Sequence, residues 1–217
     1  MRPKSPSPMQ HPALPHLSKA DPAMGQLIRR VGPCTILAQR RHQPYETLVR
    51  AIAHQQLNGR AAQTILGRFI ALFPGKRFPD PDDVRRTSVA KLRRAGFSRA
   101  KILAIKHIAA KAAAGAVPTR RAARRMTDDD LIQQLTELRG VGQWTVQMLL
   151  MFTLDRPDVL PVDDFGIREG FRLTYGLSAR PTPKEIIAYG ERWRPYRSVA
   201  SWYLWRAVEL ARAQRRS

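Results

Sequence analysis

Cysteine is almost missing from this sequence. The 217 residues include one, Cys34, which excludes a disulfide within the chain and an iron–sulfur cluster held by four cysteines. A single thiol is typical of a protein that works in a reducing compartment. The five histidines are scattered and lack the close spacing of metal ligands. We therefore expect no cofactor.

Long hydrophobic runs are also missing. No apolar stretch approaches the roughly 18 to 20 residues that a membrane-spanning helix needs. The N-terminal stretch "MRPKSPSPMQHPALPHLSKADPAM" is rich in proline and lacks the apolar core of a secretory signal. We predict that residues 1–18 form a disordered tail and that residues 19–217 form the folded domain.

Acidic residues are scarce, with 17 Asp and Glu against 38 Lys and Arg, a net charge of +21. Such an excess favours a polyanionic partner, because the partner would offset the mutual repulsion. Nucleic acid is the first candidate and an anionic membrane surface the second. A basic proteome or a solubility effect is the alternative interpretation. Arginine-rich segments recur along the chain, among them "KLRRAGFSRAK" and "TRRAARRMT".

The alternation of apolar and polar residues that marks strands is absent, and helical spacing dominates. Apolar side chains recur every three or four residues between Leu48 and Phe69, with Gly59 as a break in that stretch. Thr127 and Asp130 form a predicted capping box at the start of another helix. We therefore predict an all-α protein with eight to ten helices and no fixed repeat.

Two glycines, Gly140 and Gly142, separate a helix that ends near Leu138 from an apolar helix that begins at Gln143. Glycine allows a positive φ and a close approach of the backbone to another surface. The amides of Val141, Gly142 and Gln143 would lie at a helix N-terminus, which favours a phosphate. Such a hairpin would hold DNA without reading its sequence. A plain helix cap also explains these glycines, but the positive charge favours the DNA interpretation.

The stretches "ELRGVGQWTVQMLLMFTL" and "DVLPVDDFGIREGF" resemble the signature of the helix-hairpin-helix (HhH-GPD) DNA glycosylase superfamily, a hairpin followed by a catalytic aspartate. The resemblance is to its 3-methyladenine DNA glycosylase II branch, in the compact form without an N-terminal β-domain. "LVRAIAHQQLNGRAA" and "YGERWRPYRSVASWYLW" also resemble that branch, in the family's order. The resemblance implies a two-lobed all-α fold with the active site in the cleft between the lobes. The hairpin then spans about residues 131–154 and the catalytic segment 160–175.

The resemblance implies that Asp164, the second residue of a carboxylate pair, is catalytic. Cleavage of a glycosidic bond builds positive charge on the sugar, which a nearby carboxylate stabilises. Asp164 lies just before a predicted helix, where an anion is favoured. A simple N-cap is the alternative, and capping and catalysis can coexist. We expect Asp163 to be structural.

The resemblance also implies a pocket for an extruded base, lined by Trp144, Met148 and Trp205. Electron-rich rings suit a cationic base. Members of the superfamily that also cut the DNA backbone carry a lysine nucleophile at the position of Trp144. Tryptophan there implies that water attacks and that an abasic site is the product. By the same resemblance, Met148 stands where a bacterial member of this branch has a tyrosine.

The family's DNA wedge corresponds to the loop after residues 51–55, so Gln56 is the candidate, with Gln55 and Leu57 beside it. The hairpin would contact DNA through Gly140, Val141, Gly142 and Gln143. The resemblance further suggests a structural Na⁺ or K⁺ at the hairpin, held by the backbone carbonyls of Thr136, Leu138 and Val141.

These observations predict a monofunctional DNA glycosylase that excises alkylated purines, such as 3-methyladenine and 7-methylguanine, from duplex DNA. We expect a monomer in the bacterial cytoplasm, associated with the nucleoid and not with a membrane. Two alternatives stay open: a non-enzymatic DNA-binding protein that uses only the hairpin, and a glycosylase for deaminated or oxidised bases. A pure DNA-binding protein needs neither Asp164 nor the tryptophans.

Overall fold

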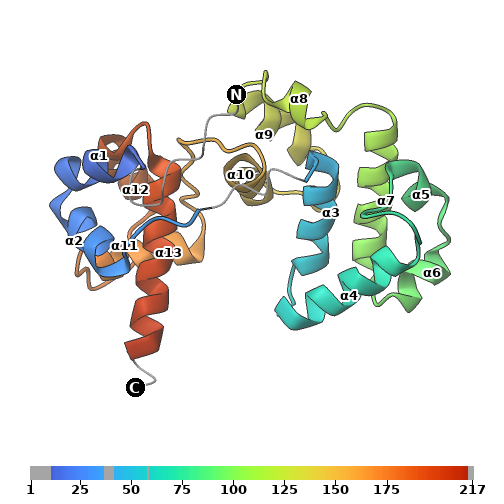
Figure 1. The fold of residues 1–217 in the computed structure, drawn as a ribbon, viewed down its shortest axis with the longest axis horizontal. Coiled ribbons are helices and arrows are strands. Elements are labelled where there is room, and N and C mark those ends of the chain that lie inside the picture. Colours follow the sequence, from blue (N-terminus) through green and yellow to red (C-terminus); the bar gives the residue numbers. More distant parts are fainter. Residues whose placement is uncertain (1–10, 37–41, 58, 215–217) are drawn as a thin grey trace. The chain divides into compact units, whose positions relative to one another are not determined.

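The computed structural model describes residues 11–36, 42–57 and 59–214. Within these ranges every regular element is a helix and no strand occurs, which confirms the all-α prediction. The chain divides into two compact units, described separately below (Figure 1). The terminal unit comprises residues 1–38 and 155–217, and the central unit comprises residues 39–154.

The terminal unit is built from both ends of the chain. Its core lies between α11 and α13, which run side by side, and it includes the buried Tyr203 and Trp193. The helices pack closely at Gly170, where an added Cβ would lie 2.0 Å from the carbonyl oxygen of Leu204. The elements are α1 (Ala13–Ala20), α2 (Pro22–Val31), α11 (Phe165–Thr174), α12 (Pro183–Gly190), the 3-10 helix η2 (Glu191–Trp193) and α13 (Arg197–Gln214).

The buried carboxylate of Asp21 joins the N-terminal helices to the rest of the terminal unit. It caps α2 by accepting the amide of Met24 at 3.0 Å. It also accepts the Trp193 indole N–H at 2.9 Å and the Tyr175 hydroxyl at 2.5 Å. Burial, followed by this carboxylate, raises the pKa of Tyr175, so the phenol stays protonated and donates. The helices before residue 32 are therefore part of the core.

The prediction of a disordered tail over residues 1–18 is wrong for its last part. Residues 13–18 belong to α1, because Ala13 and Leu17 find a fully buried environment against the terminal unit. Residues 1–10 lie outside the described residues. The predicted boundary at residue 19 therefore falls inside a helix.

The central unit holds the predicted hairpin. α3 packs against α4, α7 and α10, as Figure 1 shows for α3, α4 and α7. The capping box of Thr127 and Asp130 starts α9 as predicted. The helices are α3 (Pro44–His54), α4 (Gly59–Ala71), α5 (Pro81–Arg86), α6 (Val89–Arg94), α7 (Arg99–Ala113), α8 (Arg120–Ala123), α9 (Asp128–Thr136) and α10 (Gln143–Phe152).

The predicted number of helices is too low, since the described residues contain thirteen α-helices. The helices that the sequence pattern did not indicate are α1, α2 and α8, and α8, with four residues, is too short to show a periodic pattern. No described helix is long and apolar enough to cross a membrane. The lone thiol of Cys34 is buried in the terminal unit, and burial raises its pKa to about 11.

Candidate active site

Asp164 is the N-cap of α11 in the terminal unit. Its Oδ1 accepts the amide of Ile167 at 2.8 Å, so the carboxylate sits at the positive end of the helix. The side chain is half-buried, whereas that of Asp163 is exposed. The cap that we weighed as an alternative to catalysis is therefore present, and it fixes the direction of the carboxylate.

Trp205 contacts the same carboxylate from α13. Its indole N–H donates to Oδ1 of Asp164 at 2.8 Å. Gly166 makes this approach possible, because a Cβ at this position would lie 2.7 Å from Trp205 Cδ1 and 3.0 Å from Asp164 Oδ1. The structure thus brings together two residues that the sequence places 41 positions apart.

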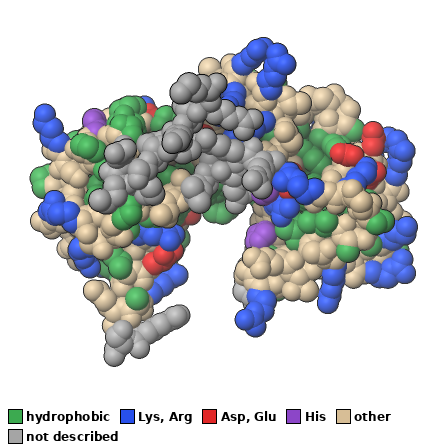
Figure 2. All heavy atoms as spheres, in the orientation of Figure 1, with side chains coloured by type: hydrophobic (Ala, Val, Ile, Leu, Met, Phe, Trp, Pro, Cys, Tyr) green, Lys and Arg blue, Asp and Glu red, His purple; other side chains and the backbone are tan. Residues whose placement is uncertain are grey.

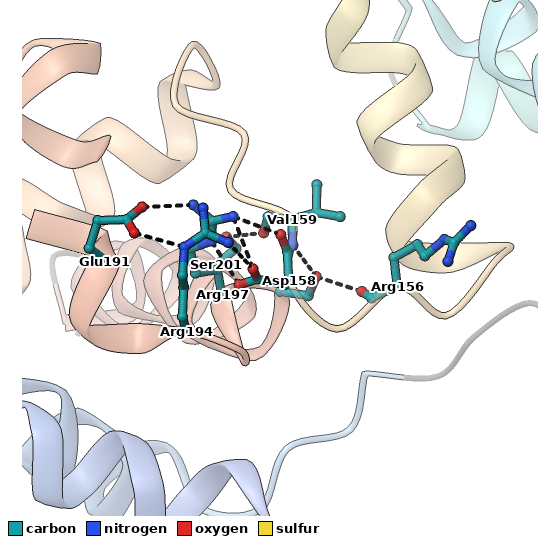
Figure 3. Close-up of polar contacts among 8 residues, drawn as sticks. Arg156, Asp158, Val159, Glu191, Arg194, Arg197 and Ser201 are labelled. Carbon is teal, nitrogen blue, oxygen red and sulfur yellow. Dashed lines mark hydrogen bonds and ion pairs between the residues drawn. The ribbon is translucent and has the colours of Figure 1, made fainter. Parts of the chain in front are cut away.

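A dense polar network binds the segment that leads to Asp164 to the first turn of α13 and to Arg194 just before it (Figure 3). Asp158 accepts two hydrogen bonds from Arg197, at 2.7 and 3.0 Å, and one from Arg194 at 2.5 Å. Ser198 donates its hydroxyl to the Arg156 carbonyl and accepts the Val159 amide. The helix that carries Trp205 therefore also fixes the loop that carries Asp164.

Replacing Asp158 with Asn is expected to lower the free energy of unfolding by about 1–2 kcal/mol, because two arginines lose a half-buried charged partner. Base release should fall with it as the loop loosens. Urea denaturation and single-turnover kinetics measure the two effects. Asp82→Asn is the control, since Asp82 forms an exposed pair with Arg85. Equal losses of stability in both variants would contradict the role of Asp158 in holding the loop before Asp164.

The glycine hairpin of the central unit has the predicted backbone. Gly140 has a φ of +80°, in the left-handed region. A Cβ there would also lie 3.2 Å from Ala104 and from Ile52, so the turn packs tightly on α7 and α3. Arg139 donates its amide to Nδ1 of His107 on α7 at 3.1 Å. The turn is therefore held by packing against α3 and α7 and by a hydrogen bond to α7.

One predicted phosphate donor in the hairpin needs correction. The amide of Val141 donates to the Leu138 carbonyl at 3.0 Å, and its side chain is buried. This amide is not free for a phosphate, because its hydrogen bond to the carbonyl three residues earlier closes the reverse turn. Gly142 and Gln143 are exposed at the start of α10, where amides lack acceptors within the helix. These two amides are the remaining candidates for a phosphate.

The predicted wedge loop follows α3 and is tied to the hairpin. Gln55 donates its Nε2 to the Gly140 carbonyl at 2.9 Å, so it supports the loop. Gln56 is exposed with a φ of 57°, and Leu57 is 40% exposed. Lys101 of α7 donates to the Ala53 carbonyl at 2.9 Å, and burial lowers its pKa. The exposed tip, residues 56 and 57, is thus held from two sides.

The predicted base-pocket residues divide between the units. Trp144 and Met148 lie one turn apart on α10 and share a face, with Trp144 45% exposed and Met148 half-buried. Trp205 lies in the terminal unit beside Asp164. Trp202 and Tyr203, whose orientation the sequence leaves open, are buried in the core. The shared pocket stays a prediction.

The predicted cation site consists of neutral carbonyls where α9 ends. Helix C-termini present carbonyls without intrahelical partners, which suits a monovalent cation. The Leu138 carbonyl accepts the Val141 amide and keeps a second lone pair. Elsewhere, the described residues contain no cluster of three or more His, Cys, Asp or Glu that could hold a metal ion. The cation at Thr136, Leu138 and Val141 stays a prediction.

On the face drawn in Figure 2, Lys and Arg side chains are scattered over both units, and Asp and Glu side chains are fewer. In the central unit many acidic groups are already neutralised: Glu46 binds Arg50 and Arg77, and Lys76 binds Asp80 and Asp83. The remaining exposed cations are available to a polyanion.

Sequence reasoning missed three supporting groups: Asp158 with its arginines, Lys101 behind the wedge loop, and His107 behind the hairpin. Their partners lie 32 to 48 residues away. The arginine-rich motif "ERWRPYRS" was the available signal for the first of them. For Lys101 and His107 a single sequence shows no signal.

Comparison with known proteins gives consistent results. A family model described as "HhH-GPD superfamily base excision DNA repair protein" matches residues 49–195. The chain is 39% identical over 197 residues to DNA-3-methyladenine glycosylase 1 of Schizosaccharomyces pombe, covering 90% of this chain and 86% of that protein.

Two solved structures are also similar to this chain. One is the Schizosaccharomyces pombe 3-methyladenine DNA glycosylase in complex with abasic DNA, with a TM-score of 0.80 and 39% identity over 90% of this chain and 95% of that one. The other is a DNA-3-methyladenine glycosidase from Bacillus halodurans, with a TM-score of 0.84 and 32% identity over 94% and 93% of the two chains.

Proposed function

The chain belongs to the HhH-GPD superfamily of base excision DNA repair proteins, and we propose that it is a DNA glycosylase of the 3-methyladenine glycosylase II type. It hydrolyses the N-glycosidic bond of alkylated purines in duplex DNA and leaves an abasic site. The substrate class is proposed from the relatives described above, which are named as 3-methyladenine DNA glycosylases or glycosidases. The residues of the terminal unit supply the chemistry.

The hydrogen-bonded pair of Asp164 and Trp205 is the observation that carries the mechanism. When the bond between sugar and purine breaks, positive charge develops on the sugar, and the Asp164 carboxylate stabilises it. An alkylated purine is already cationic and leaves without strong acid assistance. Because the α11 N-terminus and the indole N–H orient Oδ1, the carboxylate needs little reorganisation during the reaction.

Trp205 has a second role in the proposal. Its ring is half-buried beside the carboxylate, so a cationic purine stacked on it would lie close to Asp164. Trp144, exposed in the first turn of α10, and Met148 are proposed to contact the extruded base as well. The tip of the wedge loop, Gln56 with Leu57, fills the gap that the extruded base leaves in the duplex.

The proposed enzyme is monofunctional, because tryptophan at position 144 cannot form the Schiff base that strand cleavage requires. Incubation with duplexes carrying 3-methyladenine or 7-methylguanine should release the free base, and strands should break only after heat or alkali. Borohydride should trap no covalent complex. Release of neither base would refute the glycosylase, whereas a trapped complex would refute only the monofunctional reaction.

Three further properties belong to the proposal. A Na⁺ or K⁺ ion at the Thr136, Leu138 and Val141 carbonyls would stiffen the hairpin and take no part in the chemistry. The protein acts as a monomer, since one hairpin and one carboxylate complete the site. It works on chromosomal DNA in a bacterial cytoplasm.

A further inference from the structure

Phe165 is the most exposed large apolar side chain of the described residues, at 59%. It is the first residue of α11 and directly follows Asp164. Successive helix positions point about 100° apart, so Phe165 lies beside the face on which Gly166 and Trp205 meet the carboxylate. The ring is therefore not part of the core, and its contacts lie at the surface beside Asp164.

The guanidinium of Arg180 lies over this ring, 4.5 Å from its centre. Arg180 belongs to the loop between α11 and α12, and that loop is bound to α11 at two points. Arg168 donates to the Pro181 carbonyl at 3.0 Å, and Arg172 donates to the Leu177 carbonyl at 3.3 Å. The exposed arginine is therefore held by a ring and by a supported loop.

No acidic side chain of the described residues pairs with Arg180. Glu169, one turn along α11 from Phe165, is bound by Arg172 at 2.8 and 3.0 Å. A guanidinium stacked on a ring keeps its edge donors free for a planar, forked anion such as phosphate. The ring also limits the side-chain freedom that binding would remove.

We propose that Phe165 and Arg180 form a phosphate clamp for the DNA strand that carries the lesion, an inference that rests on the proposed function. When the sugar of the extruded nucleotide faces Asp164, its neighbouring phosphates lie next to the first turn of α11. Arg180 binds one of them, and Phe165 sets the plane of the guanidinium. The terminal unit would then contact a phosphate of the DNA, in addition to the contact made by the hairpin of the central unit.

The test is the salt dependence of binding to a duplex that contains a tetrahydrofuran abasic analogue. Arg180→Gln is expected to weaken binding about tenfold and to reduce the slope of log Kd against log salt by about 0.9, the value for one phosphate. Arg180→Lys should keep the slope and recover part of the affinity. Phe165→Leu should weaken binding with little change in slope. In turnover, KM should rise for Arg180→Gln while kcat is kept.

Lys184→Gln is the matched control, because Lys184 is an exposed cation four residues further along the same unit. An unchanged slope in Arg180→Gln, or an equal change in Lys184→Gln, would overturn the clamp. The binding assay needs no base release. If the wild type excises bases but Arg180→Gln binds DNA as the wild type does, only the clamp is refuted. If the wild type excises no bases, the proposed function is refuted.

Discussion

Asp164→Asn is expected to reduce the rate of base release by about 10³-fold or more, while affinity for DNA stays the same or becomes tighter. Asparagine keeps an oxygen that can accept the Ile167 amide and the Trp205 indole N–H, so the helix cap and its geometry survive. Only the negative charge is lost. A charge aimed at the developing cation commonly contributes rate effects of this size.

The measurement is single-turnover release of 3-methyladenine or 7-methylguanine from methylated duplex DNA, with binding followed separately. Asp163→Asn is the matched control: it makes the same chemical change one residue earlier, on an exposed side chain. Its rate should stay close to that of the wild type. If Asp164→Asn releases bases normally, or if both variants lose activity alike, the carboxylate is not catalytic.

Gly170→Ala is expected to have the second large effect, a loss of about 3 kcal/mol in the free energy of unfolding. The new Cβ would lie 2.0 Å from the Leu204 carbonyl oxygen and 2.6 Å from its carbon. Both are backbone atoms within α13, so no side-chain rotation can relieve the collision. Separating α11 from α13 also separates Asp164 from Trp205, and base release should fall with stability.

Gly67→Ala provides the comparison. Gly67 lies within α4, and no atom lies within 4 Å of the Cβ that would be added. Alanine in a helix interior should stabilise the protein by about 0.5–1 kcal/mol. Urea denaturation of both variants measures the difference. A Gly170→Ala protein as stable as the wild type would show that the two helices do not pack as described.

Features set by local chemistry were predictable from the sequence. The predicted capping box of Thr127 is confirmed, Gly140 has the positive φ that glycine allows, and Asp164 forms the cap that was weighed beside catalysis; each depends on residues within a few positions. The helix α1 was not predictable, because "ALPHLSKA" is stabilised by burial against segments from the other end of the chain. Asp21 shows the same limit, since its partners lie 154 and 172 residues away.

The candidate site was predictable to a similar extent. The resemblance indicated Asp164 and Trp205, but their hydrogen bond depends on the register between α11 and α13. Trp202 and Tyr203 could not be assigned to the core or to the site, because in the sequence Trp202, Tyr203, Leu204 and Trp205 form one apolar run that does not show which side faces the core. The sequence made the Val141 amide a plausible phosphate donor, but in the structure this amide donates to the Leu138 carbonyl inside the turn.

The burial of Cys34 has a consequence for the reactivity of its thiol. Agents that methylate purines are electrophiles, and in proteins they react fastest with thiolates. The chain has one thiol, and with a pKa of about 11 and little exposure it stays neutral and shielded near neutral pH. We therefore expect this thiol to react slowly with the electrophiles that generate the substrates of the protein.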